Sequence, residues 1–198
     1  MRSKGPSLLP IFRSRYQAEL LTWLLLHPDE EFGLSDLAKR LAVGPSTLHR
    51  EVDRLEEAGL LRSRSIGRNR MLRANMAHPA APSLTRLLEV VFGPRVVVAE
   101  EFASLHAEDI VIFGSWAARY AGEDGPPPHD IDVLVVGDGL DRSDVYDAAD
   151  RVHGRLGVEV NPVLRNVRQW AAPSDTLVTQ IKGSPHFSLR DVDEGVNV

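Results

Sequence analysis

The stretch DIVIFGSWAARYAGEDGPPPHDIDVLVVG (109–137) constrains the fold most, because the spacing of its apolar residues changes twice along it. It opens on a β-branched run (109–113) that is typical of a short strand. Gly114 and Ser115 then turn the chain into a segment that suits a short helix (116–122). Three consecutive prolines follow, and they exclude a helix interior, so this part is expected to be a loop.

The second strand of this stretch (130–137) alternates acidic and aliphatic residues. Because successive side chains point to opposite faces of a strand, Asp130 and Asp132 are expected to share one face. A later strand (157–164) repeats the alternation and carries Glu159. Two acids on one strand can bind a metal ion, and they can equally form the solvated face of an ordinary strand. Helical patterns at 143–156, 167–172 and 175–183 complete this part of the chain.

The net charge of −5 hides a difference between the two halves of the chain. Residues 1–78 hold 13 Lys or Arg and 9 Asp or Glu, whereas residues 79–198 hold 10 and 19. A basic half joined to an acidic half predicts two domains with different partners. The basic half suits a ligand that carries phosphates. The acidic half suits cations, or it is simply a soluble surface.

Composition excludes several classes of protein. The chain has no cysteine, which rules out disulfides and cysteine-ligated zinc or iron–sulfur sites. No apolar run approaches the roughly 20 residues of a membrane span, and the basic start lacks the apolar region of a signal peptide. We therefore expect a cytoplasmic protein that has no membrane partner.

Two helical patterns with a tight break between them lie in the basic half, after an earlier helical pattern at 14–27. Ser35 is expected to cap the first of the two (34–43). Pro45 suits the first turn of the second (46–58). A short helix, a tight turn and a second amphipathic helix form a helix-turn-helix pattern.

The polar face of the second helix carries groups that can reach base edges and phosphates in a major groove. They are hydroxyl, imidazole and guanidinium groups, and most lie near the helix N-terminus. These residues are Ser46, Thr47, His49, Arg50 and Arg54.

A basic hairpin is predicted directly after this helix. The segment LLRSRSIGRNRMLRAN (60–75) gives two short strands around a Gly-Arg-Asn turn (67–69). Its five arginines have no acid among them. Such a hairpin can follow phosphates or place an arginine in the minor groove. The arginines are Arg62, Arg64, Arg68, Arg70 and Arg73.

The order of helix, turn, helix and basic hairpin resembles the winged helix-turn-helix regulators of the ArsR/MarR type over residues 12–78. The resemblance implies a first domain (1–80) that binds double-stranded DNA as a homodimer on a pseudo-palindromic site. Arg64, Arg68 and Arg70 join the helix residues as expected DNA contacts. The alternative is a winged helix that serves protein contacts only, with its arginines as a solvated face.

A proline-rich segment (77–83) predicts a linker between the domains. The apolar segment after it (83–105) reads as helical and is broken at Gly93 and Pro94. Three interpretations fit this segment: a helix that forms a dimer, the linker itself, or the first helix of the second domain.

The second half resembles the polymerase-β-like nucleotidyltransferase superfamily, and in particular its minimal nucleotidyltransferases, over residues 95–183. The shared features are an apolar strand, a Gly-Ser turn into a helix, a strand with Asp-x-Asp, and a carboxylate on a later strand. The resemblance implies an α+β protein of two domains. The second domain (81–198) would contain a nucleotidyltransferase-like mixed α/β sheet.

The resemblance also implies a nucleotide site with metal ions. A turn after a strand can present backbone N–H groups and a hydroxyl to the phosphates of a nucleoside triphosphate. Two carboxylates on one strand face can bridge two Mg²⁺ or Mn²⁺ ions about 3.5–4 Å apart, and a third carboxylate completes the second metal. The nucleotide-binding residues implied are Gly114, Ser115 and Arg119. The implied metal ligands, which are also the implied catalytic residues, are Asp130, Asp132 and Glu159.

The chain departs from the superfamily pattern in three places. Residues 116–129 separate the Gly-Ser turn from the Asp-x-Asp strand, which is a longer gap than the compact form of the family has. His129 stands where the family often has Ser. The third carboxylate is a glutamate, and Asn161 follows it two residues later as a neutral ligand.

Three functions are consistent with these patterns. The first is a DNA-binding transcriptional regulator whose second domain binds, or transfers a nucleotidyl group from, a nucleoside triphosphate with Mg²⁺. The second is an active nucleotidyltransferase, antitoxin-like or protein-modifying, whose winged helix serves autoregulation and whose partner is a cognate toxin or a protein acceptor. The third is an interaction module with a degenerate nucleotidyltransferase site.

Overall fold

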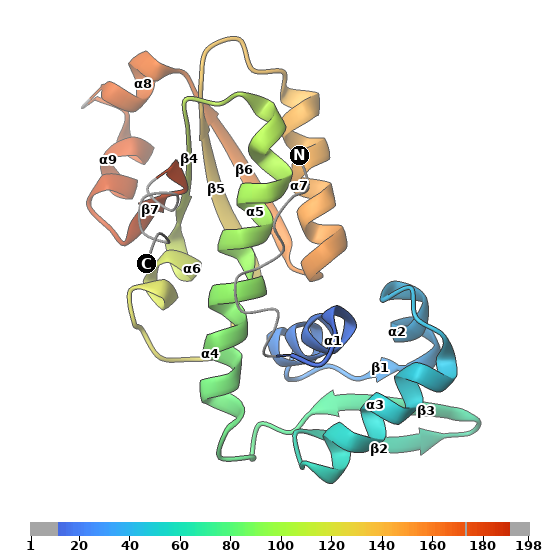
Figure 1. Ribbon diagram of the computed structural model, residues 1–198. Helices are drawn as coiled ribbons and strands as arrows, with labels where there is room; N and C mark the ends of the chain where they lie inside the picture. The colour runs from blue at the N-terminus through green and yellow to red at the C-terminus, as the bar shows by residue number, and fades with distance from the viewer. Residues whose placement is uncertain (1–11, 173, 191–198) are drawn as a thin grey trace. The chain divides into compact units, whose positions relative to one another are not determined.

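The computed structural model describes residues 12–172 and 174–190 (Figure 1). The contacts divide these residues into two compact units, of which the first ends at Gly93 and the second begins at Pro94. Both units contain helices and strands, so the protein belongs to the α+β class. No helix among the described residues combines the length and the apolar character needed to cross a membrane.

The first unit is a winged helix. Its described helices and strands follow the order of this fold, and β1 joins the hairpin in an antiparallel sheet of strand order β1-β3-β2. The two-residue strand β1 is the element that apolar spacing did not predict. The elements are α1 (Arg15–Leu26), β1 (Phe32–Gly33), α2 (Leu34–Arg40), α3 (Pro45–Glu57), β2 (Leu61–Ile66), β3 (Asn69–Ala74) and α4 (Ala81–Phe92).

Local sequence explains where these helices begin. The hydroxyl of Ser14 accepts a hydrogen bond from the backbone of Gln17 and so caps α1. Pro45 lies in the first turn of α3, as predicted, where its missing N–H costs nothing. The expectation that Ser35 caps α2 is wrong. The N-cap is Gly33, because its extended backbone ends β1 and the helix follows at once.

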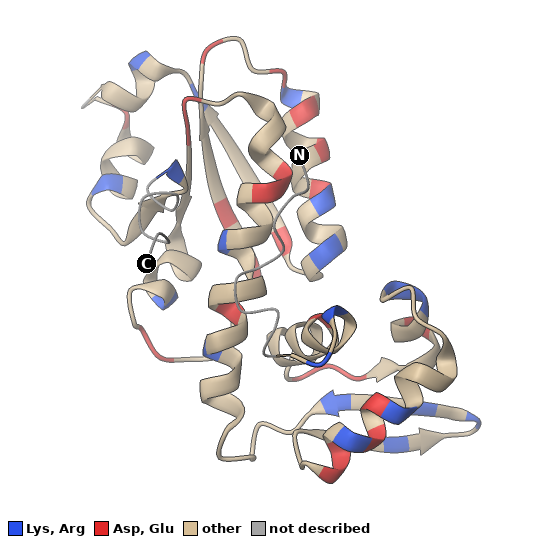
Figure 2. Ribbon diagram, viewed as in Figure 1, with Lys and Arg blue, Asp and Glu red and all other residues tan. Residues whose placement is uncertain are grey.

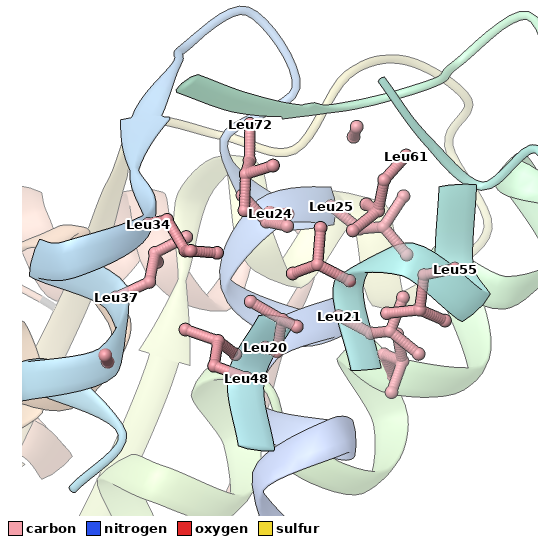
Figure 3. Close-up of a cluster of buried hydrophobic side chains, with 14 of the residues drawn as sticks. Leu20, Leu21, Leu24, Leu25, Leu34, Leu37, Leu48, Leu55, Leu61 and Leu72 are labelled. Atoms are coloured by element: carbon pink, nitrogen blue, oxygen red, sulfur yellow. The ribbon is translucent and has the colours of Figure 1, made fainter. Parts of the chain in front are cut away.

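Leucine side chains form the core of the first unit (Figure 3). They come from α1, α2, α3 and the two strands of the hairpin, so the base of the hairpin is anchored in the same core as the helix-turn-helix. The labelled leucines are Leu20, Leu21, Leu24, Leu25, Leu34, Leu37, Leu48, Leu55, Leu61 and Leu72.

Helix α4 belongs to this unit because it packs against α1, and the rings of Phe12 and Phe92 meet edge to face at 5.5 Å. Segment 83–105 is divided between the units, since α4 closes the first unit and α5 (Pro94–Phe102) is the first helix of the second. The division between the units therefore falls later in the chain than the boundary expected after residue 80. The interpretation of this segment as a helix that forms a dimer stays a prediction.

The second unit is built on a mixed sheet of strand order β6-β5-β4-β7. Strands β5 and β6 are parallel, whereas β4 pairs antiparallel with both β5 and β7. Strand β7 was not predicted. The elements after α5 are the 3₁₀ turn η2 (Ala103–Leu105), β4 (Asp109–Phe113), α6 (Gly114–Tyr120), β5 (Asp130–Val136), α7 (Arg142–Leu156), β6 (Glu159–Arg165), α8 (Val167–Ala171), α9 (Thr176–Lys182) and β7 (His186–Ser188).

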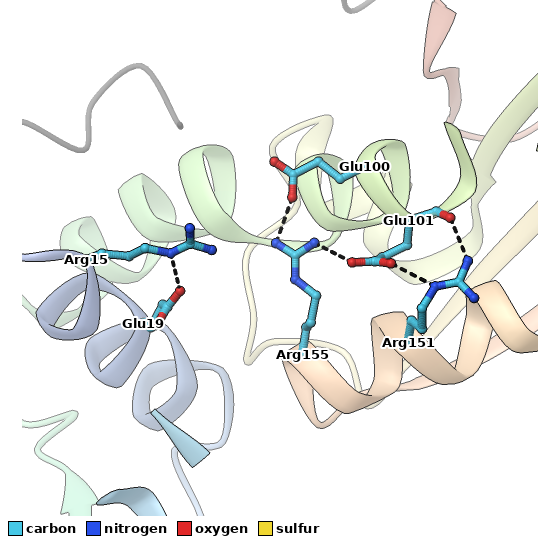
Figure 4. A network of polar contacts seen from close by, with 6 residues as sticks. All are labelled: Arg15, Glu19, Glu100, Glu101, Arg151 and Arg155. Atoms are coloured by element: carbon cyan, nitrogen blue, oxygen red, sulfur yellow. Dashed lines mark hydrogen bonds and ion pairs between the residues drawn. The ribbon is translucent and has the colours of Figure 1, made fainter. Parts of the chain in front are cut away.

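Ion pairs join α5 to α7 beside this sheet (Figure 4). Glu101 of α5 accepts from the guanidinium groups of Arg151 and Arg155, with N–O distances of 2.9 and 2.7 Å. Glu100 also pairs with Arg155, at 2.7 Å. These contacts join α5 firmly to the second unit.

The core of the first unit predicts a contrast between two hairpin positions. Leu72 is fully buried in the leucine core, so Leu72→Ala should lower the free energy of unfolding by about 2–5 kcal/mol. Ile66 is 50% exposed, and Ile66→Ala should change it by only about 0.5 kcal/mol. Urea denaturation of both variants measures the difference, and equal losses would place the hairpin outside the core.

Candidate functional site

Helix α3 presents the polar face that the sequence predicted. Ser46, His49, Arg50 and Arg54 are exposed and Thr47 is half-buried. The opposite face of the helix is buried in the leucine core. Their contact with DNA stays a prediction.

The hairpin divides its arginines between two faces. Residues paired across β2 and β3 lie on the same face, so Arg62, Arg64 and Arg73 share the outer face. Arg70 lies on the inner face, with Leu61, Leu72 and Ala74, which are buried. Figure 2 shows basic residues along both strands of the hairpin, whereas α3 carries both signs of charge.

Two of the predicted DNA contacts have acidic partners within the protein. Arg64 forms a forked contact with Glu31, in which its Nε lies 2.9 Å from each carboxylate oxygen. The hydrogen bonds from Arg64 hold the pKa of Glu31 below its ordinary value. Arg54 pairs with the buried Glu51 at 3.5 Å. Both arginines are still largely exposed and can reach a second ligand.

Arg70 makes the densest set of polar contacts in the hairpin. Its Nη1 donates to Asp53 at 2.7 Å, its Nη2 donates to Glu56, and its Nε donates to Ser63 Oγ at 3.2 Å. Burial opposes the charged form of Arg70, but the hydrogen bonds to the two carboxylates outweigh it, so the pKa of Arg70 lies above its ordinary value. The structure therefore engages Arg70 with α3, and its expected contact with DNA stays a prediction.

Several other arginines of the first unit are exposed and have no acidic partner among the described residues. Within the described residues, Arg50, Arg62 and Arg68 are exposed and form no ion pair. Arg62 lies directly opposite Arg73 in the hairpin register. Like charges in directly opposed positions destabilise a strand pair. The outer face of the hairpin thus holds positive charge that an external anion would offset.

The three carboxylates that the sequence predicted as metal ligands lie on the paired strands β5 and β6. Asp130 lies opposite Glu159, and Asp132 lies opposite Asn161. The Asn161 side-chain N–H group donates to Asp130 Oδ2 at 3.0 Å and to Asp132 Oδ1 at 3.4 Å. Glu159 is exposed at the start of β6. The residue that joins the two aspartates is therefore the amide of Asn161, and the predicted Glu159 lies beside them at the strand end.

The surroundings of Asp132 disfavour its charged form. Burial raises the pKa of Asp132, the charge of Asp130 adds to that increase, and the hydrogen bond from Asn161 opposes it. The ionised pair is therefore strained by its own charge, and a bound cation would relieve this repulsion.

Gly114 lets the chain pass close to Asp132. Its φ is +69°, and a Cβ built on it would lie 2.5 Å from Asp132 Oδ2. Ser115 follows at the start of α6 and is exposed. The predicted Gly-Ser turn therefore lies beside the aspartate pair in space, although the proline-rich loop separates the two along the chain.

Arg119 is buried on α6 and contacts the proline-rich loop. Its side chain is only 7% exposed, and it donates to the carbonyl oxygen of Gly125 in the proline-rich loop. Trp116 on the same helix is fully buried, in line with a packing role. The Arg119 side chain therefore holds the proline-rich loop against α6. Its contact with a nucleotide stays a prediction.

The donor set does not fit a site for two metal ions. Among the described residues, no group of three His, Cys, Asp or Glu side chains is placed to hold one ion. Asp130 and Asp132 supply carboxylate oxygens, which Mg²⁺ and Mn²⁺ prefer, whereas Asn161 turns toward them its N–H group, which is not a metal ligand. The two carboxylates offer ligands for one cation, and the binding of a cation stays a prediction.

Two glycines in left-handed conformations test the close approach at Asp132. Gly114→Ala should lower the free energy of unfolding more than Gly122→Ala, because Gly122 has φ +107° and no atom near its missing Cβ. Left-handed backbone alone costs an alanine about 1–2 kcal/mol, and the clash should add about 1 kcal/mol or more at position 114. Urea denaturation compares them. Equal losses, or no recovery on adding Asp132→Ala to Gly114→Ala, would exclude the contact.

No family model and no curated protein sequence matches this chain. Several solved structures are similar to it. Reduced HlyU from Vibrio cholerae is 21% identical over 44% of this chain and 86% of that one, with a TM-score of 0.36. A MarR family regulator from Rhodococcus sp. RHA1 is 22% identical over 50% and 75%, with a TM-score of 0.38. The regulator BldR from Sulfolobus solfataricus is 22% identical over 47% and 63%, with a TM-score of 0.35.

Proposed function

We propose that the protein is a DNA-binding transcriptional regulator, which contacts double-stranded DNA through α3 and the β2–β3 hairpin. In this proposal the protein acts as a homodimer on a pseudo-palindromic site, as winged helix regulators usually do. The exposed hydroxyl and guanidinium groups at the start of α3, on Ser46 and Arg50, face base edges and phosphates.

The opposition of Arg62 and Arg73 supports this function most directly. A protein surface that serves solubility alone gains nothing from placing two arginines directly opposite each other. A DNA backbone supplies negative charges at short intervals and would offset both. Arg68, in the hairpin turn, extends the same positive surface to the end of the hairpin.

Salt dependence tests the DNA proposal. Each phosphate contact contributes about 0.9 to the slope of log K against log salt. Arg62→Gln with Arg68→Gln should therefore weaken binding to any duplex and lower the slope by about 1.8. The exposed Arg142, in the second unit, gives a matched control as Arg142→Gln. An unchanged slope in the hairpin variant would exclude the hairpin from the interface.

A second function is favoured by the hydrogen bonds of Asn161 to both aspartates. We propose that the second unit binds a nucleoside triphosphate through one Mg²⁺ or Mn²⁺ held by Asp130 and Asp132, with Ser115 beside the phosphates. The bound cation would neutralise phosphate charge. Because an amide stands between the carboxylates, the unit is proposed to bind the nucleotide without transferring its nucleotidyl group to a toxin or other acceptor.

Metal addition tests this second function. A ligand present at a hundred times its Kd raises the free energy of unfolding by about 2.7 kcal/mol, so Mg²⁺ with nucleotide should stabilise the protein by that amount. Asp130→Asn with Asp132→Asn should abolish the effect. Glu159→Gln should preserve it, and Asn161→Asp should strengthen metal binding by adding a carboxylate. If Glu159→Gln loses the stabilisation by Mg²⁺ and nucleotide, Glu159 is a metal ligand, as the sequence predicted.

Incubation with labelled nucleoside triphosphate and cell extract separates binding from transfer. The wild-type protein should hold label without passing it to an acceptor. An acceptor that is labelled by the wild type, and not by the double asparagine variant, would establish a nucleotidyltransferase.

A further inference from the structure

Arg70 lies where the hairpin leaves the core of the first unit. The base of the hairpin is held by Leu61 and Leu72, which are almost fully buried. Ser63, which pairs with Leu72, is exposed, and so are Ser65 and Ile66 further out along β2. Polar contacts therefore help to set the direction of the outer hairpin, together with the pairing of β3 with β1 and the contact of Arg64 with Glu31.

The contacts of Arg70 cross from this outer part to α3. Asp53 and Glu56 are three residues apart on α3 and so lie on one face of the helix. Arg70 donates to both, and its third donor group reaches Ser63 on the neighbouring strand. In the described part of the chain, the side-chain hydrogen bonds between the hairpin and α3 all involve Arg70.

Geometry separates this role from a phosphate contact. A guanidinium group offers its donors in a rigid plane, and here the plane is matched to two carboxylates and a hydroxyl. The Arg70 side chain is 24% exposed, against 63% for Arg64 on the outer face. A phosphate at Arg70 would also have to approach the carboxylates of Asp53 and Glu56, which repel it.

We infer that Arg70 is a positioning residue, which fixes the outer hairpin against α3 so that both elements fit DNA at the same time. This inference rests on the proposed DNA binding, and it specifies which hairpin arginines contact the DNA and which one does not. The hairpin arginines then divide into Arg62, Arg64, Arg68 and Arg73, which are exposed toward a ligand, and Arg70, which sets their angle to α3.

Removing the acidic partners of Arg70 tests the inference, because charge and positioning predict opposite changes in the affinity for DNA. Asp53→Asn with Glu56→Gln takes two negative charges from the DNA-binding face, and charge alone predicts tighter binding. Positioning predicts the opposite, a loss of about tenfold, because Arg70 loses the partners that orient the hairpin. Affinity for a duplex at fixed salt decides between them. Binding as tight as the wild type, or tighter, overturns the inference.

Variants of Arg70 itself add a second readout. Arg70→Lys keeps the positive charge but cannot fill the three-partner fork, so it should lose about as much affinity as Arg70→Gln. Arg68→Gln is the matched control, and it should lower the salt slope by about 0.9 while Arg70→Lys leaves the slope unchanged. Full affinity in Arg70→Lys overturns the inference, because charge alone would then suffice.

Hydrogen exchange in the free protein keeps this test separate from the test of DNA binding. Backbone amides at 63–70 should exchange faster in Arg70→Gln and in the double acid variant than in the wild type or Arg68→Gln. Unchanged exchange overturns the positioning role. If the wild type fails to bind any duplex, the proposed function is overturned, and the exchange rates still decide whether Arg70 orients the hairpin.

Discussion

Side chains alternate across a paired strand, and this constraint decides which charged groups meet in both units. In the hairpin, the pairing of β2 with β3 sends Arg62 to one face and Arg70 to the other. In the second unit, Asp130 and Asp132 share a face of β5, and the parallel register of β6 then adds Asn161. A slip of one residue would exchange the faces of a strand. Both candidate sites therefore depend on register, which the buried residues of the same strands maintain.

Each unit holds an excess of one sign of charge at its candidate site. In the first unit, acidic residues of α3 and of the loop before β1 pair with Arg70 and Arg64, and Arg62 and Arg68 are left for the solvent side. In the second unit, two carboxylates share one neutral amide. Protein groups offset only part of the charge in either place. In the functions proposed above, a phosphate backbone would complete the first arrangement and a cation would complete the second.

Much of the fold could be predicted from the sequence, because helix periodicity, strand alternation and turn residues are local signals. The helix-turn-helix, the hairpin and the Asp-x-Asp strand were all found this way. The two shortest strands were missed, since two or three residues carry no period. The partners of Arg70 and the hydrogen bonds of Asn161 to both aspartates could not be predicted, because they depend on how distant segments pair. The local sequence around a residue does not determine which residue of another strand lies opposite it.

The Asn161 amide has one more chemical consequence. Asparagine can lose its amide and become aspartate when the backbone nitrogen of the next residue attacks its side chain. The next residue here is Pro162, whose ring nitrogen carries no hydrogen, so this spontaneous route is blocked. The neutral side chain at position 161 is therefore protected from the fastest route by which an asparagine acquires a negative charge. In the gene, by contrast, a single base change converts a codon for Asn into one for Asp and would add a carboxylate beside the other two.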